Sequence, residues 1–458
     1  MREFDLVVIG AGPGGYEAAL EAARVYKMKT ALVEKSALGG TCLNRGCIPT
    51  KALLHSAAIW RQLKEADHCG ISVSGMSADP EKMHQYKDEV TGRLRDGIAA
   101  MMKQQKVSVF SGTGMITDAH HVKVTSAENG EERVLETEYI LIATGSVVSR
   151  PPIPGLDLPG VLTSDELLEK RDSIPEQLVI IGGGVIGMEF AFLYGSLGTK
   201  VTVIEALPRI LANLDKEISQ SLRMQLKKLE VDIHASAAVS KIYQSDDGKL
   251  VCEYREKETD QCVTAENILV CTGRRPFTEG LFAEGIDVET NRGRITTDEF
   301  GRTSIENVYA IGDVTGKIML AHAAAAQGRN ALAHMNGLPA PIREDLVPSC
   351  IYTDPEIACV GMTLEEAKSN GIEAVSRKAL MTSNGRSVIA GQDRGYIRVV
   401  YEKESGRVLG AQMMCENASD LISEFTQAIA LGTTLDRMGS VIRPHPSFSE
   451  GITDAVRL

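Results

Sequence analysis

The sequence has 458 residues, of which 43% are hydrophobic, and its formal net charge at pH 7 is −12. A chain of this length exceeds what one hydrophobic core supports, so we expect two or three domains. Acidic residues are spread along the whole chain and no block of Lys or Arg occurs, which argues against nucleic acid as a partner.

The sequence shows no sign of export or of membrane insertion. Residues Met1–Asp5 lead directly into the apolar segment Leu6–Ile9, without the basic region and cleavage site of a secretory signal. The longest uncharged stretches, such as Leu178–Met188, are shorter than the roughly 20 apolar residues that span a bilayer. We therefore expect a cytoplasmic protein with no membrane span.

The first predicted elements belong to an internal repeat. Each copy has an apolar strand, Leu6–Ile9 or Leu178–Ile181, then a Gly-x-Gly-x-x-Gly turn and a helical segment, Tyr16–Tyr26 or Met188–Leu197. In this context the turn holds the pyrophosphate of a dinucleotide at the helix N-terminus. The glycines of the two turns are Gly10, Gly12 and Gly15 in the first copy and Gly182, Gly184 and Gly187 in the second.

Each copy continues into a second strand that ends in an acid. The strands Thr30–Val33 and Lys200–Ile204 are followed by Glu34 and Glu205, where a carboxylate would bind the ribose hydroxyls. Alone, either acid could be an ordinary strand-end residue facing solvent. An acid at Glu205 repels a 2′-phosphate, so the second site should prefer NAD over NADP, although Arg209 lies close by in the sequence.

Two cysteines, Cys42 and Cys47, are separated by four residues, and a helix is predicted from about Cys42 through Ala58. A structural disulfide or two buried thiols are the alternatives to a redox function, but structural disulfides are rare in cytosolic proteins. Lys51 lies one helical turn after Cys47, where its charge can stabilise a thiolate. No metal site is predicted, because the other cysteines show neither tight pairing nor zinc-ligand spacing: Cys69, Cys252, Cys262, Cys271, Cys350, Cys359 and Cys415.

Further strands complete the two copies. Tyr139–Gly145 and Ile268–Gly273 are apolar segments that run into glycine turns, and the alternating pattern between Gly112 and Tyr139 predicts a β-hairpin. Pro151–Gly155 is a stiff connector into the second copy.

The sequence pattern changes after about Pro348. Short strands such as Gly395–Tyr401 alternate with amphipathic helices such as Asp420–Leu431. We expect a third domain of the α+β class.

The segment Gly39–Lys51, together with the doubled glycine turn, resembles the flavin-dependent pyridine nucleotide-disulfide oxidoreductases. Within that family, the run from Gly40 to Pro49 is most similar to the dihydrolipoamide dehydrogenases. The resemblance covers essentially the whole chain. Further matching segments, in the order typical of the family, are Ala143–Ser146, Gly273–Pro276, Tyr309–Asp313, Leu320–His322 and His445–Glu450.

The resemblance implies an α/β fold with two Rossmann-like domains and a C-terminal α+β dimerisation domain. The FAD-binding domain would comprise residues 1–145 and 274–345, the NAD-binding domain residues 146–273 and the interface domain residues 346–458. The implied FAD-binding residues are Gly10, Gly12, Gly15, Glu34, Thr41, Lys51, Thr144, Gly145, Gly312, Asp313, Leu320 and Ala321, and the implied NAD-binding residues are Gly182, Gly184, Gly187, Glu205 and Gly273.

The resemblance also implies the catalytic roles. Cys42 would exchange with substrate, and Cys47 would lie against the flavin. Lys51 would pair with Glu189 near the flavin, where Asp313 would hold the ribityl chain. Thiol–disulfide exchange also needs a group with a pKa near neutrality that can take up the thiol proton and return it.

In the family this group is a histidine that acts across a dimer interface. By resemblance, it is His445 in this chain, and Glu450 orients it. Without the resemblance, His445 would be an ordinary loop histidine. We therefore expect a homodimer that oxidises the dihydrolipoyl groups of 2-oxo acid dehydrogenase or glycine cleavage complexes and passes hydride to NAD⁺.

Other functions stay open at this point. A glutathione-type reductase usually carries a basic residue where Glu205 stands, and a mercuric reductase usually adds a C-terminal cysteine pair, whereas the last cysteine here is Cys415. A flavin NADH oxidase or transhydrogenase would not need Cys42 and Cys47. A structural subunit whose dinucleotide sites only stabilise the fold is the non-catalytic alternative.

Three segments depart from the family pattern. Arg45 stands between the cysteines where a small apolar residue is usual, and Ala323–Ala326 replaces a more polar run. Arg443 and Pro444 precede His445 where the family commonly has His-Ala. Arg45 could retune the disulfide, and Arg443 could repel a proton on His445 if the side chains approach.

Overall fold

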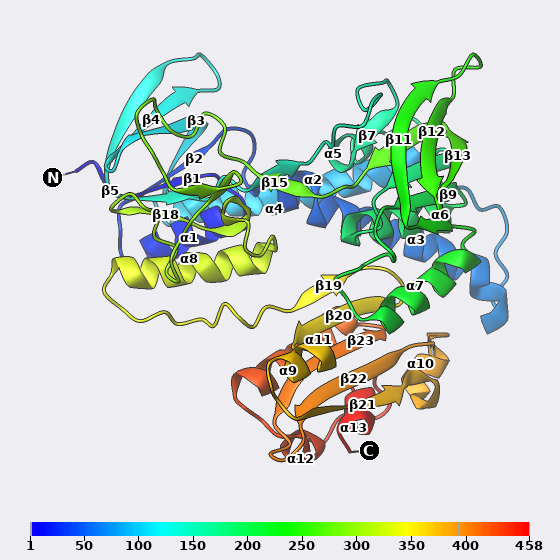
Figure 1. Cartoon of the computed structure of the whole chain (residues 1–458). Helices are drawn as coiled ribbons and strands as arrows, with labels where there is room; N and C mark the ends of the chain where they lie inside the picture. Colours follow the sequence, from blue (N-terminus) through cyan, green and yellow to red (C-terminus); the bar gives the residue numbers. More distant parts are fainter. Residues whose placement is uncertain (1, 393, 458) are drawn as a thin grey trace. The chain divides into compact units, whose positions relative to one another are not determined.

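The fold is described from a computed structural model, which describes residues 2–392 and 394–457. The chain forms two compact units, each assembled from segments distant in the sequence (Figure 1). The first unit comprises Met1–Ser56, Gly75–Ile174 and Leu269–Glu344, and the second comprises Ala57–Ser74, Pro175–Ile268 and Asp345–Leu458.

The first unit is built on a mostly parallel sheet. Its strands are β1 Phe4–Ile9, β2 Thr30–Glu34, β3 Ser108–Asp118, β4 His121–Ser126, β5 Glu132–Ile142 and β18 Val308–Ala310. The parallel order is β3-β2-β1-β5-β18, with Val7 of β1 between Ala31 and Ile140. Strand β4 pairs antiparallel with extensions of β3 and β5, which confirms the hairpin predicted between Gly112 and Tyr139.

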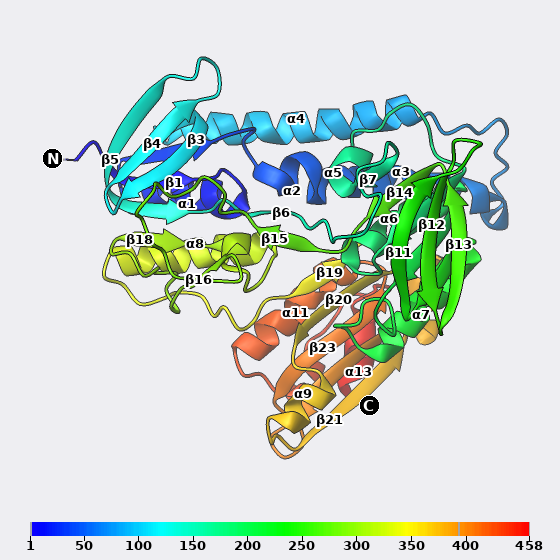
Figure 2. The same cartoon turned by 45° about the horizontal axis from the view of Figure 1, so that its top comes forward.

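Small residues bring two helices of the first unit close together. Helix α1, Pro13–Arg24, links β1 to β2 and packs against helix α8, Ala321–Met335 (Figures 1 and 2). A Cβ atom on Gly14 would lie 2.9 Å from the Cβ of Ala324, so neither position has room for a larger side chain. This packing gives a physical reason for a small residue at Ala324, within the alanine run at the start of α8.

Further helices and short strands complete the first unit. Figure 2 shows the long helix α4 along its length. The helices are α2 Gly40–Arg45, α4 Pro80–Gln104 and α5 Ser164–Leu167. The short strands are β6 Ser146–Val148, β7 Val161–Thr163, β15 Arg274–Pro276, β16 Thr290–Asn291 and β17 Arg294–Ile295. Helix α3, Cys47–Glu65, begins in the first unit and ends in the second.

The second unit begins with the second copy of the repeat. Its elements are β8 Gln177–Ile181, α6 Val185–Leu197, β9 Lys200–Glu205, α7 Lys216–Lys228, β10 Asp232–Ala235 and β14 Asn267–Val270. The strand order is β10-β9-β8-β14, with β10, β9 and β8 parallel. An antiparallel sheet of β11 Ala237–Gln244, β12 Leu250–Glu256 and β13 Thr259–Ala265 precedes β14.

The C-terminal part of the second unit is an antiparallel sheet of order β19-β20-β23-β22-β21. The strands are β19 Ser349–Ile351, β20 Glu356–Gly361, β21 Ala374–Leu380, β22 Tyr396–Glu402 and β23 Val408–Cys415, and the helices are α9 Leu364–Ser369, α10 Gly385–Ile389, α11 Ala418–Ala430, α12 Leu435–Gly439 and α13 Glu450–Arg457. Phe425 of α11 and Ile452 of α13 are fully buried in the same core as Ile397 and Met413 of the sheet.

The structure confirms most predicted elements and corrects one. Both βαβ copies, the strand near Gly395–Tyr401 and the helix near Asp420–Leu431 are present. The helix predicted from Cys42 through Ala58 is instead two helices, because Gly46 interrupts it. The predicted domain boundaries stay a prediction. Within the described part of the chain, none of the helices combines the length and the apolar character needed to cross a membrane.

Candidate active site and dinucleotide sites

The two glycine turns have the same backbone geometry. Gly10 and Gly182 adopt φ values of +101° and +111°, which side chains other than glycine rarely tolerate. A Cβ on Gly15 would lie 1.8 Å from the Gly10 carbonyl oxygen, and one on Gly187 would lie 2.1 Å from the Gly182 oxygen. Each helix is therefore packed against its turn as closely as a glycine allows.

The middle glycine of each turn, in contrast, faces open space. Gly12 and Gly184 are the N-cap residues of α1 and α6, and no atom lies within 4 Å of a Cβ placed on either. Neither helix start has a side-chain cap. The exposed N–H groups and the positive end of the helix dipole can therefore accept a phosphate group, so both turns fit a dinucleotide.

The acids that end the second strands also make matching hydrogen bonds. The Glu34 carboxylate accepts from the backbone N–H of Ala11 at 2.7 Å, and the Glu205 carboxylate accepts from that of Gly183 at 2.5 Å. Each also accepts from the backbone N–H two residues further along, at 2.8 and 2.6 Å. Both carboxylates are thus fixed beside a glycine turn, and carboxylate oxygens keep lone pairs that can accept ribose hydroxyls.

Arg209 has partners within its own loop. Its guanidinium donates to the backbone oxygens of Ala212 and Leu214 at 2.7 and 2.6 Å and to the Ser219 hydroxyl at 3.3 Å. These bonds shape the segment after β9 and occupy three of the five guanidinium donors, which leaves fewer for a 2′-phosphate. The geometry therefore favours an NAD site at Glu205.

Two predicted FAD-binding residues, Asp313 and Thr144, are hydrogen-bonded to other residues of the first unit. The Ser146 hydroxyl donates to the Asp313 carboxylate at 2.5 Å and receives a hydrogen bond from Arg274 Nε at 2.8 Å. The Thr144 hydroxyl donates to the backbone oxygen of Phe277 at 2.7 Å. Ser146 and Arg274 belong to matching segments of the sequence, but their role in holding Asp313 is a tertiary contact that the motifs did not reveal.

The other predicted FAD-binding positions lie at turns and helix starts. Gly145 and Gly312 both have φ of +71°, and the Gly312 N–H donates to the Gln327 side chain at 2.7 Å. Leu320 is the N-cap of α8, so Ala321 is its first residue. Thr41 lies in α2, one residue before Cys42.

The two cysteines come together where α2 ends and α3 begins. A Cβ on Gly46 would lie 3.0 Å from the Thr41 oxygen, so the glycine allows the chain to turn sharply between the helices. The Cys42 and Cys47 side chains are hydrogen-bonded to each other. This bond and burial raise the pKa of Cys42, while the Lys51 charge acts in the opposite direction.

One neighbour of the pair, Tyr16, was not singled out by the motifs. Tyr16 of α1 lies close enough to interact electrostatically with Cys42, and burial, with Glu17 and Cys42 adding to it, raises the pKa of Tyr16 to about 12. The Tyr16 hydroxyl therefore stays protonated near the thiols. Arg45 donates to the Ser36 hydroxyl at 3.0 Å, on the loop after Glu34.

His445 and Glu450 are in contact in the second unit. His445 Nδ1 lies 2.9 Å from Glu450 Oε1, and the other carboxylate oxygen accepts from the Ser447 N–H at 2.9 Å. Arg443 pairs with Glu424 of α11, so its charge is matched by a carboxylate. The predicted arrangement of His445 and Glu450 is present within one chain.

Glu189 and Gly273 each form a hydrogen bond within their own unit. Glu189 is buried in α6 and accepts a hydrogen bond from the Tyr352 N–H at 3.1 Å, both in the second unit. Lys51 belongs to the first unit, so its pairing with Glu189 stays a prediction. Gly273 also belongs to the first unit, where its carbonyl accepts from the Ser149 N–H at 2.9 Å, and its contact with NAD likewise stays a prediction.

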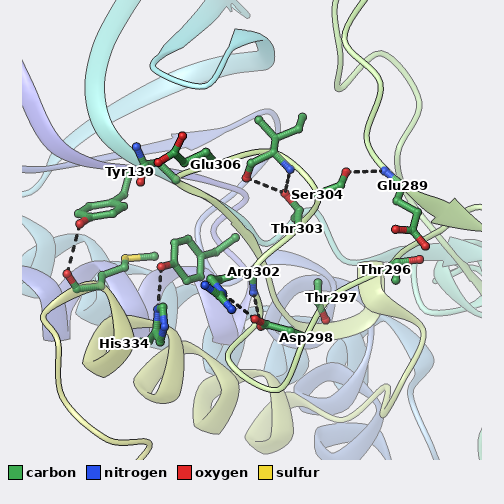
Figure 3. A pocket seen from close by; sticks show the side chains of 14 residues that line it. Tyr139, Glu289, Thr296, Thr297, Asp298, Arg302, Thr303, Ser304, Glu306 and His334 are labelled. Carbon is green, nitrogen blue, oxygen red and sulfur yellow. Dashed lines mark hydrogen bonds and ion pairs between the residues drawn. The ribbon is translucent and has the colours of Figure 1, made fainter.

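An open groove of about 610 Å³ lies elsewhere in the first unit (Figure 3). Tyr139, Tyr309 and His334 line it, and Asp298 is ion-paired to Arg302 at its wall. The groove lies along β5 and β18 before their C-terminal ends, whereas the glycine turn follows the C-terminal end of β1. Its described lining contains none of the predicted site residues.

Three of the other cysteines are neutral thiols in their folded environment. Burial raises the pKa of Cys252, Cys359 and Cys415 to about 12, so they remain thiols at neutral pH. The described residues also include no group of three or more His, Cys, Asp or Glu side chains that could hold a metal ion. The Cys42–Cys47 pair is the chemically distinctive one.

Comparison with known proteins shows where this geometry recurs. A family profile for pyridine nucleotide-disulphide oxidoreductases matches residues 4–328, and the profile for the dimerisation domain of these enzymes matches residues 347–456. The chain is 38% identical to a dihydrolipoyl dehydrogenase of Chlorobaculum parvum, over 99% of this chain and 96% of that protein. It is 40% identical to a dihydrolipoyl dehydrogenase of Bacillus subtilis, over 99% and 97%.

Solved structures give the same result. LpdA from Mycobacterium tuberculosis superimposes with a TM-score of 0.91 at 27% identity, over 99% of both chains. The flavoprotein disulfide reductase RclA from Escherichia coli superimposes with a TM-score of 0.87 at 28% identity, also over 99% of both. With two glycine cradles, a thiol pair and a C-terminal dimerisation domain, the chain belongs to the pyridine nucleotide-disulphide oxidoreductase family.

Proposed function

We propose that the chain is a dihydrolipoyl dehydrogenase, which oxidises protein-bound dihydrolipoyl groups and reduces NAD⁺. The observation that carries the proposal is the hydrogen bond between the Cys42 and Cys47 side chains, in the same unit as the first glycine turn. The curated relatives with this name span nearly the whole chain, which supports the same reaction.

Thiol–disulfide exchange at the pair accounts for the first half of the reaction. A dihydrolipoyl thiolate attacks Cys42 of the Cys42–Cys47 disulfide, and Cys47 leaves as a thiolate. The second dihydrolipoyl thiol then attacks the mixed disulfide, which releases lipoyl and returns Cys42 as a thiol. The raised pKa of Cys42 supports this distribution of the protons, because it favours the neutral form of that residue.

Histidine chemistry moves the first proton. His445 takes the proton from the attacking thiol at Nε2, because Nδ1 is directed at Glu450. Glu450 holds the ring in that orientation. In this proposal His445 serves the site of a second copy of the chain, in keeping with the match to a dimerisation domain.

FAD, when bound, carries two electrons from the thiol pair to the nicotinamide. The open space at Gly12 and the carboxylate of Glu34 support an adenosine and pyrophosphate site, and the Ser146–Asp313 contact supports a ribityl site. Lys51, paired with Glu189, would supply a positive charge near the thiolate. The net reaction converts dihydrolipoyl and NAD⁺ to lipoyl, NADH and a proton.

The second glycine turn would bind NAD. The fixed carboxylate of Glu205 and the engaged guanidinium of Arg209 support a preference for NAD over NADP. We further propose an FAD-binding domain of residues 1–145 and 274–345, an NAD-binding domain of residues 146–273 and an interface domain of residues 346–458. Gly273 would close the NAD site.

The partners in this proposal are the lipoyl-bearing subunits of 2-oxo acid dehydrogenase or glycine cleavage complexes. The lipoyl groups of both are dithiols of the same chemistry, so the reaction alone does not distinguish them. A cytoplasmic location stays a prediction from the sequence.

A related reaction is the second candidate. RclA, a similar structure, is named as a flavoprotein disulfide reductase, so reduction of another disulfide by NADH is the alternative. The two differ in the substrate that reaches Cys42 and in the direction of electron flow.

The experiment that tests the proposal compares substrates with the purified flavoprotein. We expect rapid NADH formation from dihydrolipoamide and NAD⁺, and negligible rates with NADP⁺ or, in the reverse direction, with glutathione disulfide. A Cys42→Ser variant should lose the dihydrolipoamide reaction but still pass electrons from NADH to ferricyanide. A wild-type preference for glutathione disulfide over lipoamide would contradict the proposal.

A further inference from the structure

We propose that Arg443 is a positioning residue for His445. It ties the start of the loop that carries the imidazole to the helix whose first residue, Glu450, orients it. The inference rests on the proposed function, because it takes His445 to be the base that removes the thiol proton.

The guanidinium of Arg443 is buried at a junction of three helices. Its side chain is only 4% exposed and is ion-paired to Glu424 of α11. A second nitrogen donates to the Thr453 hydroxyl of α13 at 2.8 Å, and the backbone oxygen of Met438 in α12 lies 3.4 Å away. Arg443 therefore fixes its own backbone relative to all three helices.

The loop between Arg443 and Glu450 has few other anchors for the imidazole. The side chain of His445 is 80% exposed in the chain, and its hydrogen-bond partner is Glu450 at 2.9 Å. Glu450 also holds the loop through the Ser447 N–H. The loop is thus clamped at its start by Arg443 and at its end by the N-terminal residue of α13, and between them Asn384 donates to the Ser447 oxygen at 2.9 Å.

Only one residue, Pro444, separates Arg443 from His445. The proline ring fixes φ at this link, so a displacement of Arg443 is passed to the imidazole instead of being absorbed by a flexible residue. Proton transfer from a thiol needs Nε2 within hydrogen-bond reach of the sulfur. A small shift of the loop would therefore lower the rate without removing any reacting group.

Arginine suits this position because it makes several directed bonds at once. Its planar guanidinium offers five donors, which here reach Glu424 and Thr453 on different helices. A lysine could neutralise Glu424 but could not hold both partners in a fixed geometry. Charge balance and positioning are therefore separable by mutation.

Two variants separate the two roles. Thr453→Val keeps the ion pair and removes only the hydrogen bond to α13. The double variant Arg443→Met, Glu424→Gln removes both charges, so no unpaired charge is left buried. As a matched control, Arg457→Met removes a 2.8 Å bond from Arg457 to the Gly439 oxygen, at the opposite end of α13 from Glu450.

Activity is measured in two assays with the FAD-loaded dimer. Oxidation of dihydrolipoamide by NAD⁺ requires the base, whereas reduction of ferricyanide by NADH does not. We expect kcat for dihydrolipoamide to fall about tenfold in the double variant and less in Thr453→Val, a fraction of the roughly 10²-fold or greater contribution of a general base. The ferricyanide rate should be unchanged, as should both rates in Arg457→Met.

A structural readout accompanies the assays. Amide hydrogen exchange of the segment 444–452 should be faster in Thr453→Val and in the double variant than in the wild type, because the loop has lost its clamp. Exchange elsewhere in the second unit should be unchanged. The double variant should melt within a few degrees of the wild type, since both charges are absent.

The remaining outcomes separate this inference from the proposed function. If His445→Gln loses dihydrolipoamide oxidation while the Thr453 and double variants keep it, Arg443 has no positioning role. Equal losses in both assays would show that Arg443 only maintains the fold, and would also overturn the inference. If His445→Gln keeps full activity, the proposed role of His445 fails first.

Discussion

Glu205, the last residue of β9, and Arg209, four residues further along, have different partners. The Glu205 carboxylate is held by the Gly183 backbone beside the second glycine turn, where it can meet a ribose. The Arg209 guanidinium is held by carbonyl oxygens of its own loop. Coenzyme choice is therefore expected to depend on the acid alone.

Glu205→Ala should lower kcat/KM for NAD⁺ by about tenfold or more, because a hydrogen bond to a charged group contributes about 1.5–3 kcal/mol. The ratio of NAD⁺ to NADP⁺ use should fall as the repulsion of the 2′-phosphate is removed. Arg209→Met should leave that ratio unchanged within about twofold. Steady-state kinetics with both coenzymes test this, and a large change of the ratio in Arg209→Met would contradict the assignment.

At the scale of single residues, the sequence predicted which residues belong to the sites better than it predicted their contacts. Glu34 and Glu205 were found because a strand, a glycine turn and an acid recur in the same order. The link from Ser146 to Asp313 joins two segments far apart in the sequence, whose approach depends on the folded chain. Spacing in the sequence does not determine such contacts.

At the scale of elements, each glycine turn combines one position that has no space for a Cβ atom and one position where a Cβ atom would meet no neighbour. Ala at Gly15 would place its Cβ 1.8 Å from the Gly10 oxygen, whereas Ala at Gly12 would meet no protein atom within 4 Å. The first contact maintains the fold, and the open position leaves room for a ligand.

Gly15→Ala should therefore lower the melting temperature of the protein or prevent its folding, because α1 can no longer approach its turn. Gly12→Ala should fold but bind FAD weakly, because the methyl group occupies the space for the pyrophosphate. Circular dichroism and the ratio of flavin to protein absorbance distinguish the two effects. A Gly12→Ala protein with full flavin content would contradict the assignment of this turn.

Helix α4 contains a buried histidine, His84. Its Nδ1 atom has no hydrogen-bond partner among the described residues, and burial, with the Lys87 and Arg171 charges adding to it, lowers the pKa of His84. An unfolded histidine has a pKa of about 6.5. Below that value the unfolded chain binds a proton that the folded chain does not, so stability is lost as the pH falls.

The urea midpoint of the wild type should consequently fall more between about pH 7.5 and about pH 5.5 than that of His84→Leu. His68→Gln, a change at an exposed histidine, is the matched control and should follow the wild type. Equal pH dependence of the wild type and His84→Leu would show that His84 does not contribute to acid sensitivity.

Two helices show where prediction of elements from the sequence was incomplete. Gly46 was read as part of one helix, whereas its contact with Thr41 ends α2 and starts α3. Helix α4 was not predicted, although Asp79 caps it by accepting from the Lys82 N–H at 3.1 Å and Pro80 occupies its first turn. Its capping pattern was therefore present in the sequence and was overlooked.

At the scale of the whole molecule, the internal repeat made the two dinucleotide folds predictable, because a repeated motif implies a repeated structure. The dimerisation domain was expected from the resemblance and is matched by residues 347–456. The proposed approach of His445 of one chain to Cys42 of another would depend on an interface between two copies, which a single sequence does not encode in a readable motif.

Ile442, in the dimerisation domain, exposes 96% of its surface in the single chain. We expect a second copy to cover it, so Ile442→Asp should weaken the dimer and lower dihydrolipoamide oxidation more at low protein concentration. Met224→Asp, at a residue 65% exposed on α7 outside that domain, is the control. Sedimentation velocity and activity against concentration test this, and an unchanged dimer in Ile442→Asp would contradict it.

The central claim is that Cys42 and Cys47 form the redox pair through which dithiol electrons enter the protein. The direct test is an anaerobic titration of the flavoprotein with dihydrolipoamide, followed by alkylation and mass spectrometry of the two cysteines. We predict a Cys42–Cys47 disulfide before the titration, both sulfurs alkylated after it, and the disulfide restored by excess NAD⁺. NADH formation while the two sulfurs remain unlinked and unchanged throughout would contradict the account.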